Sequence, residues 1–151
     1  MIRRVESADR RAEIARTILE ALPDWFEVEA SRERYIAESR EWRMLADIED
    51  GRPLGFLCLK ETGRATVELA VMGVLKAHHR EGRGRRLAEA AMDCAREAGY
   101  RFMQVKTVKM GVYEEYDATN RFYRSLGFQE FEVIPELWGP ENPCQIYVLA
   151  L

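Results

Sequence analysis

The chain has 151 residues, of which 26 are acidic and 23 are basic, giving a formal net charge of −3. This length is typical of one domain with its own hydrophobic core, so we expect residues 1–151 to form a single domain. The acidic balance argues against a nucleic-acid partner, and no apolar run approaches the roughly 18 residues of a membrane span. Because the first residues also lack the apolar stretch of a signal peptide, we expect a cytoplasmic protein without a membrane partner.

Hydrophobic periodicity predicts the element order β-α-α-β-β-β-α-β-α-β-β. The expected strands are residues 2–5, 42–48, 53–60, 65–74, 102–108, 128–133 and 145–149. The expected helices are residues 9–22, 31–39, 82–98 and 116–126, with Ser31 as the cap of the second helix. Residues 49–52 predict a hairpin turn, and Gly99 and Gly127 each end a helix.

Alternation along residues 65–74 divides this strand into two mostly apolar faces, so we expect a central strand that is covered on both sides. One face carries Glu68 together with Ala70, Met72 and Val74. A carboxylate in an apolar run supports two interpretations, which both stay open. Glu68 is either a general base or a solvated residue at the exposed start of the strand.

Residues 71–87 are an apolar strand, a basic turn with two glycines, and the start of a long amphipathic helix. This order directs unpaired backbone N–H groups and the positive end of a helix dipole at one point, which predicts a phosphate site. Gly82 and Gly84 remove the Cβ atoms that would keep a pyrophosphate from the backbone. Four arginines add positive charge: Arg80, Arg83, Arg85 and Arg86.

Two common phosphate loops do not fit this segment. A dinucleotide fingerprint needs a third glycine where Leu87 stands, and a P-loop needs Gly-Lys-Ser/Thr, which the chain lacks. The adjacent histidines, His78 and His79, are expected to flank the loop rather than bind a metal, because no acidic residue lies at ligand spacing. Cys58, Cys94 and Cys144 are scattered and show no metal spacing either.

The six residues His79-Arg80-Glu81-Gly82-Arg83-Gly84 resemble the acetyl-coenzyme A loop of GNAT-type N-acetyltransferases, Arg/Gln-x-x-Gly-x-Gly/Ala, with histidine in the first position. A second segment, residues 119–128, resembles the late motif of that family, an aromatic-Tyr pair on a helix followed by Leu-Gly-Phe. The two motifs stand in the family's order, 39 residues apart from Gly84 to Tyr123.

The resemblance implies an α/β (α+β) fold with a mixed, mostly antiparallel seven-stranded sheet, helices on both faces and splayed central strands. It also implies acetyl-CoA as co-substrate, with no metal, and a general acid at Tyr123 beside the coenzyme A sulfur. The base of the family often lies on the strand of Glu68. The cofactor-binding residues implied by position are Met72, Gly73, Val74, His79, Arg80, Gly82, Arg83, Gly84, Arg85 and Asn120.

The expected reaction is transfer of an acetyl group to a primary amine by direct attack, because no nucleophile with an adjacent base is visible. Three alternatives stay open: Tyr123 is only a core aromatic, the acyl group is longer, or the domain binds CoA as a sensor without turnover. The acceptor is not identified by the sequence, and a homodimer through exposed strand edges near the C-terminus is an open possibility.

Overall fold

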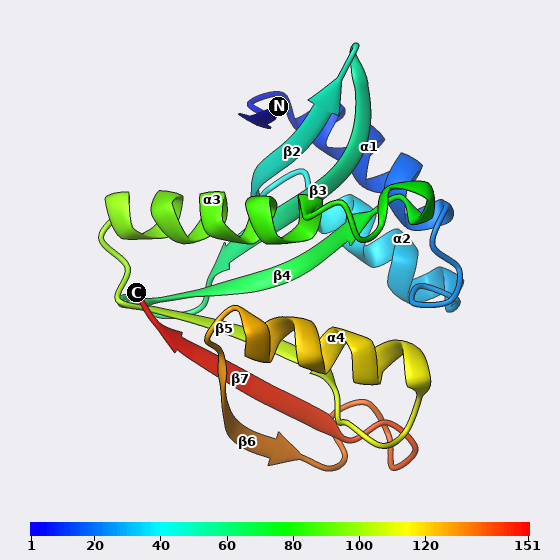
Figure 1. The fold of residues 1–151 in the computed structure, drawn as a ribbon, viewed down its shortest axis with the longest axis vertical. Coiled ribbons are helices and arrows are strands. Elements are labelled where there is room, and N and C mark those ends of the chain that lie inside the picture. The colour runs from blue at the N-terminus through cyan, green and yellow to red at the C-terminus, as the bar shows by residue number, and fades with distance from the viewer. The chain divides into compact units, whose positions relative to one another are not determined.

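The computed structural model describes residues 1–151 and contains the strands and helices in the expected order (Figure 1). The strands are β1 Ile2–Arg4, β2 Arg43–Glu49, β3 Arg52–Glu61, β4 Thr66–Val74, β5 Phe102–Val108, β6 Gln129–Ile134 and β7 Cys144–Ala150. The helices are α1 Ala8–Glu20, α2 Glu29–Glu38, α3 Arg83–Glu97 and α4 Glu114–Ser125. A 3₁₀ turn, η1 Lys76–His78, was not predicted from the sequence.

The strands form one seven-stranded sheet in the order β1-β2-β3-β4-β5-β7-β6. Neighbouring strands are antiparallel in the pairs β1/β2, β2/β3, β5/β7 and β6/β7. Strands β4 and β5 are parallel, with Thr66–Glu68 in register with Phe102–Gln104. The expectation of a mixed, mostly antiparallel sheet is therefore confirmed.

Backbone contacts divide the chain into two compact units. Unit 1 comprises Met1–Lys60 and Ala70–Cys94, and unit 2 comprises Glu61–Leu69 and Ala95–Leu151. The chain passes between them within β4 and within α3. The glycine-rich turn thus belongs to unit 1, whereas Glu68 and Tyr123 belong to unit 2.

Unit 1 packs α1 and α2 against its strands. Ile14, Ile18 and Leu19 of α1 are completely buried, as the helical spacing predicts, and share a core with Met44 of β2 and Phe56 of β3. The β2–β3 hairpin turns at Asp50 and Gly51, whose φ angles of 49° and 76° are both positive, as a tight two-residue hairpin requires.

Gly73 marks a very close approach of α1 to β4. A Cβ at this position would lie 2.8 Å from Leu22 Cδ1 and 3.0 Å from Ile18 Cγ2, so no larger residue fits without a shift. This glycine therefore permits tight helix–strand packing in the interior of unit 1.

Three details differ from the expectations. Helix α2 begins at Glu29, and Ser31 lies in its first turn instead of capping it, because Val28 accepts the first backbone bond from the Arg32 amide. Helix α4 begins at Glu114, since acidic residues stabilise an N-terminal turn. In β4 only one face is buried; the residues that alternate with it, including Glu68, are half-buried.

Unit 2 packs α4 against β5 and β7. Tyr147 of β7 is completely buried, and the ring of Tyr123 lies 6.2 Å from it and 5.7 Å from the ring of Phe128. Gly127, with a φ of 100°, ends α4 as expected. Strand β6 forms the edge of the sheet and is exposed along its length, with Phe131 68% exposed.

Candidate active site

The glycine loop, residues 79–84, has the backbone geometry of an anion site. Arg80 and Gly82 have φ angles of 65° and 77°, so the chain turns twice through the left-handed region before α3 begins at Arg83. The first turn of the helix closes with a 3.0 Å bond from the Arg86 amide to the Gly82 carbonyl. Backbone N–H groups in such a turn, at the N-terminus of a 15-residue helix, can bind a phosphate group.

The two histidines hold the loop from two directions. His79 Nε2 donates to the Val74 carbonyl at 2.7 Å, which connects the loop to the end of β4. The rings of His79 and Trp25 pack edge to face, with their centroids 5.8 Å apart. His78 Nδ1 lies 2.8 Å from Glu81 Oε1. No cluster of three or more His, Cys, Asp or Glu side chains that could hold a metal ion is found.

Arg83 has an environment that the sequence did not predict. Its side chain is only 11% exposed, and its guanidinium lies 2.8 Å from Asp47 Oδ2, 3.1 Å from Glu49 Oε1 and 3.4 Å from Glu81 Oε1. We call these four residues the Arg83 cluster. The side chain predicted to meet a phosphate is therefore directed at three carboxylates.

Asp47 is the most buried member of the Arg83 cluster, with its side chain 3% exposed. Burial opposes its ionisation, but hydrogen bonds from Arg83 and from the amino group of Met1 outweigh burial and hold the pKa of Asp47 below its ordinary value. The pKa of Glu81 is also lowered, chiefly by its hydrogen bond with His78. These environments favour the ionised forms of Asp47 and Glu81.

The end of β4 supplies the backbone that was expected to meet pantetheine. Met72 and Val74 are half-buried, and Leu75 N donates to Leu54 O at 2.8 Å. The neighbouring strand approaches closely here, because a Cβ on Gly55 would lie 3.1 Å from the Gly73 carbonyl oxygen. The Val74 carbonyl already accepts from His79.

In unit 2, Glu68 forms an ion pair that the sequence did not predict. Lys106 Nζ of β5 lies 2.7 Å from Glu68 Oε1, and the two side chains are 33% and 13% exposed. Beside them Gln104 Nε2 donates to Thr62 Oγ1 at 2.8 Å. Glu68 is therefore a mostly covered carboxylate with a cationic neighbour, which does not fit a freely solvated side chain.

Asn120, expected at the cofactor, is completely buried in unit 2. Its amide nitrogen donates to the carbonyls of Val108 at 2.9 Å and Tyr116 at 2.6 Å, and its oxygen accepts from the Tyr147 hydroxyl at 2.6 Å. Arg124 Nε donates to the same hydroxyl at 3.2 Å. These bonds join β5, α4 and β7, so Asn120 supports the helix that carries Tyr123.

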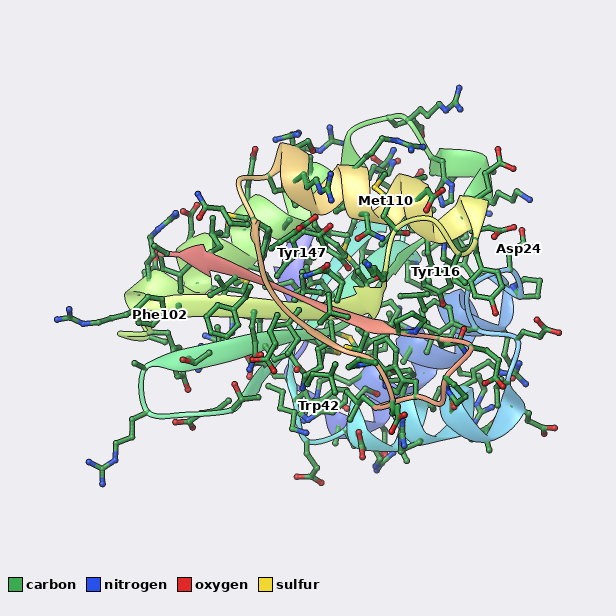
Figure 2. All side chains as sticks on the ribbon, turned by 90° about the horizontal axis from the view of Figure 1, so that it is seen from below. Asp24, Trp42, Phe102, Met110, Tyr116 and Tyr147 are labelled. Carbon is green, nitrogen blue, oxygen red and sulfur yellow. The ribbon has the colours of Figure 1, made fainter.

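The two predicted catalytic side chains lie on opposite faces of the unit 2 sheet. Tyr147, labelled in Figure 2, directs its side chain toward α4, where its ring lies near Tyr123. Its register partner on β5 is Val105, and the next residue, Lys106, points to the other face because side chains alternate along a strand. The Glu68–Lys106 pair therefore lies on the face away from α4.

Asp47 and Lys106 were both missed by the sequence reasoning. Lys106 is the single charged residue of β5, which is the same signal that drew attention to Glu68, whereas Asp47 shares β2 with Arg43 and Glu49. A charge at such a position needs a partner, and a search for opposite charges among the predicted strands would have offered Lys106 for Glu68.

The family model of the acetyltransferase (GNAT) family matches residues 12–128, which include the glycine loop, β4, β5 and α4. The chain belongs to the acetyltransferase (GNAT) family. This confirms the resemblance drawn from the two motifs.

Solved structures share the whole fold at low sequence identity. A protein assigned to the GNAT acetyltransferases of Desulfovibrio desulfuricans superposes with a TM-score of 0.87 at 20% identity, covering 99% of this chain and 98% of the other. The yncA protein of Salmonella typhimurium, solved with acetyl-CoA, superposes with a TM-score of 0.73 at 24% identity, covering 100% of this chain and 93% of the other. An aminoglycoside 6'-N-acetyltransferase solved with coenzyme A superposes with a TM-score of 0.74 at 17% identity, covering 99% of this chain and 96% of the other. None of the helices is long and apolar enough to cross a membrane.

Proposed function

We propose that this protein transfers the acetyl group of acetyl-CoA to a primary amine by direct attack within a ternary complex. The observation that carries the proposal is the glycine loop, with two left-handed residues immediately before the N-terminus of α3. A side chain at Gly82 would be strained in this conformation and would meet Arg86 Nη1 at 3.3 Å, so the bare backbone is required. A pyrophosphate fits this cradle.

The acceptor amine must lose a proton before it attacks. A primary amine with a pKa near 10.4 is only about 0.04% neutral at pH 7, so a base accelerates the reaction. Glu68 is our candidate base, acting directly or through a water, and its carboxylate lies 2.7 Å from Lys106. The backbone of residues 72–74 is our candidate for the contact to the thioester oxygen.

The departing thiolate needs a proton, and Tyr123 is our candidate acid. Its reference pKa of about 10 is high enough to protonate a thiolate with a pKa near 8.5 at modest cost. The ring is held by Phe128 and Tyr147, which limits the positions of its hydroxyl.

The first experiment is a calorimetric titration with acetyl-CoA, CoA, dephospho-CoA and an adenine nucleotide without pantetheine. Binding that depends on the pyrophosphate is expected. The next step is a free-thiol assay with acetyl-CoA and a panel of primary amines, among them amino acids, polyamines, aminoglycosides and peptides with free N-termini. Butyryl-CoA in the same assay tests the acyl chain length.

Each outcome of this experiment has a distinct meaning. Absence of binding at millimolar acetyl-CoA contradicts the proposal. Tight binding of CoA without release of thiol on any amine supports the alternative of a CoA-binding domain without turnover. Faster release from butyryl-CoA than from acetyl-CoA supports transfer of a longer acyl group.

A further inference from the structure

The Arg83 cluster joins the glycine loop to strand β2, which lies more than thirty residues earlier in the chain. Arg83 is the first residue of α3, and Asp47 and Glu49 belong to β2. The bond to Asp47 spans 36 residues and the bond to Glu49 spans 34. The third partner of the guanidinium is Glu81, which lies in the glycine loop. Arg83 therefore contacts both strand β2 and the loop.

This arrangement is unexpected at a site for an anion. Asp47, Glu49 and Glu81 place three carboxylates beside a loop whose backbone would bind phosphate, and unpaired negative charges there would repel the ligand. Arg83 neutralises part of this charge, while its planar fork donates to more than one oxygen at once. The side chain thus holds the loop in place rather than reaching for the ligand.

Asp47 lies next to an irregularity in the pairing of β2 with β3. Its register partner on β3 is Gly55, and the pairing shifts between Asp47 and Ile48. A Cβ on Gly55 would meet Val74 and Leu87 at 3.1 and 3.2 Å, so these side chains pack closely over Gly55, and the Asp47 side chain is only 3% exposed. This burial strengthens the ion pair with Arg83 and fixes its direction.

We propose that Asp47 is a positioning residue for coenzyme A binding, which acts through Arg83 to hold the glycine loop in its binding conformation before the ligand arrives. The inference rests on the proposed function, since it assumes that the glycine loop binds the pyrophosphate of CoA. A loop that is ordered in advance does not lose conformational entropy on binding, and its affinity is higher for that reason. Releasing Arg83 from Asp47 therefore weakens binding of CoA.

The test is calorimetric titration of CoA into the whole protein and into Asp47→Asn, which keeps the size of the side chain and removes its charge. We expect the dissociation constant to rise about tenfold, the loss that follows when one charge-assisted hydrogen bond is removed. Glu33→Gln is the matched control, because Glu33 of α2 forms an exposed ion pair with Arg16 of α1 and is not a member of the Arg83 cluster. The control is expected to bind CoA as the unchanged protein does.

A double-mutant cycle shows whether Asp47 acts through Arg83. In Arg83→Met the acids are left without their cation, so binding is expected to weaken more than in Asp47→Asn. Adding Asp47→Asn to Arg83→Met is expected to cost nothing further or to restore some affinity. Independent losses that multiply in the double variant would overturn the proposal, because Asp47 would then act by another route, such as its bond with the Met1 amino group.

Two further measurements separate positioning from a general effect on folding. Amide hydrogen exchange at Gly82 and Gly84 in the ligand-free protein is expected to speed up in Asp47→Asn, while exchange in the α1 core is unchanged. If Asp47→Asn does not fold, Glu49→Gln loosens the same cluster from its half-exposed side and takes its place. Unchanged CoA affinity together with faster loop exchange overturns the inference alone, whereas no CoA binding by the unchanged protein overturns the proposed function itself.

Discussion

Lys106 of β5 lies 2.7 Å from Glu68 of β4, and both side chains extend from the face of the unit 2 sheet that α4 does not cover. Glu68 is in register with Gln104, so Lys106 is the diagonal neighbour two residues further on, within reach of a long side chain. The pair restricts the directions in which the carboxylate can accept a proton. A base held in this way meets its substrate in a defined geometry.

Replacing Lys106 by methionine is expected to lower kcat about tenfold while KM for the amine changes little, because the carboxylate loses the cation that orients it. Glu68→Gln is expected to lower kcat about a hundredfold. Lys106→Arg, which keeps the charge, is expected to recover most of the activity. Steady-state kinetics with the best amine of the panel measure all three. A rise in KM with an unchanged kcat would show instead that Lys106 binds the acceptor.

Replacing Tyr123 by phenylalanine removes the hydroxyl and keeps the ring between Phe128 and Tyr147. Turnover is expected to fall at least tenfold with little loss of affinity for CoA, because proton donation to the thiolate is lost. Free-thiol release and calorimetry measure the two quantities. Near-normal turnover would reject the acid role and leave Tyr123 as a core aromatic. Thermal unfolding of both proteins checks that the helix is intact.

Replacing Gly73 by alanine is expected to destabilise the protein by about 1–3 kcal/mol, because the new Cβ would lie 2.8 Å from Leu22 Cδ1 and force α1 away from β4. Gly63→Ala is the matched control. Its Cβ would come no closer than 3.9 Å to Thr66, so it is expected to be neutral or up to about 1 kcal/mol more stable. Urea unfolding measures both. Equal stability of the two variants would contradict the close packing at Gly73.

The buried thiol of Cys144 is expected to make the free energy of unfolding decrease at alkaline pH. Burial raises the pKa of its thiol to about 11, with a smaller opposing effect of Lys106. In the unfolded chain a thiol titrates near 8.5, so the contribution of Cys144 to the free energy of unfolding is complete below that pH and declines as the pH rises toward 11. Urea unfolding from pH 8 to 11 measures it.

The matched control for this titration is Cys94→Ala, which leaves Cys144 in place. We expect the alkaline decline to be shallower in Cys144→Ala than in the unchanged protein, and as steep in Cys94→Ala. Identical slopes in all three proteins would show that the Cys144 thiol does not contribute.

Local signals in the sequence were sufficient for much of the fold. The hairpin at Asp50 and Gly51 and the end of α4 at Gly127 were predictable because each depends on a few adjacent residues that permit a left-handed backbone. The glycine loop was predictable for the same reason. Helix starts without a side-chain cap, such as the start of α2 after Val28, carried no such signal.

The partners of the charged residues could not be predicted, because they depend on which strands become neighbours. Arg83 was expected to face phosphate, but two of its three acids, Asp47 and Glu49, come from β2, which is distant in the sequence. The pair of Glu68 with Lys106 depends likewise on the parallel pairing of β4 and β5. The need for a glycine at position 73 could not be predicted either, because it depends on the packing of α1 against β4.

The exposed edge strand β6 has a consequence for the solubility of the protein. Its pairing with β7 shifts between Glu130 and Glu132, which leaves Phe131 as an extra residue in a bulge. Glu130 then stands opposite Tyr147 and Glu132 opposite Ile146, so the two carboxylates lie on opposite faces of the edge. Glu130 is paired with Arg124 of α4, so a strand of another molecule would meet the bend and the carboxylate of Glu132, and we expect both to oppose edge-to-edge pairing although Phe131 itself is open to water.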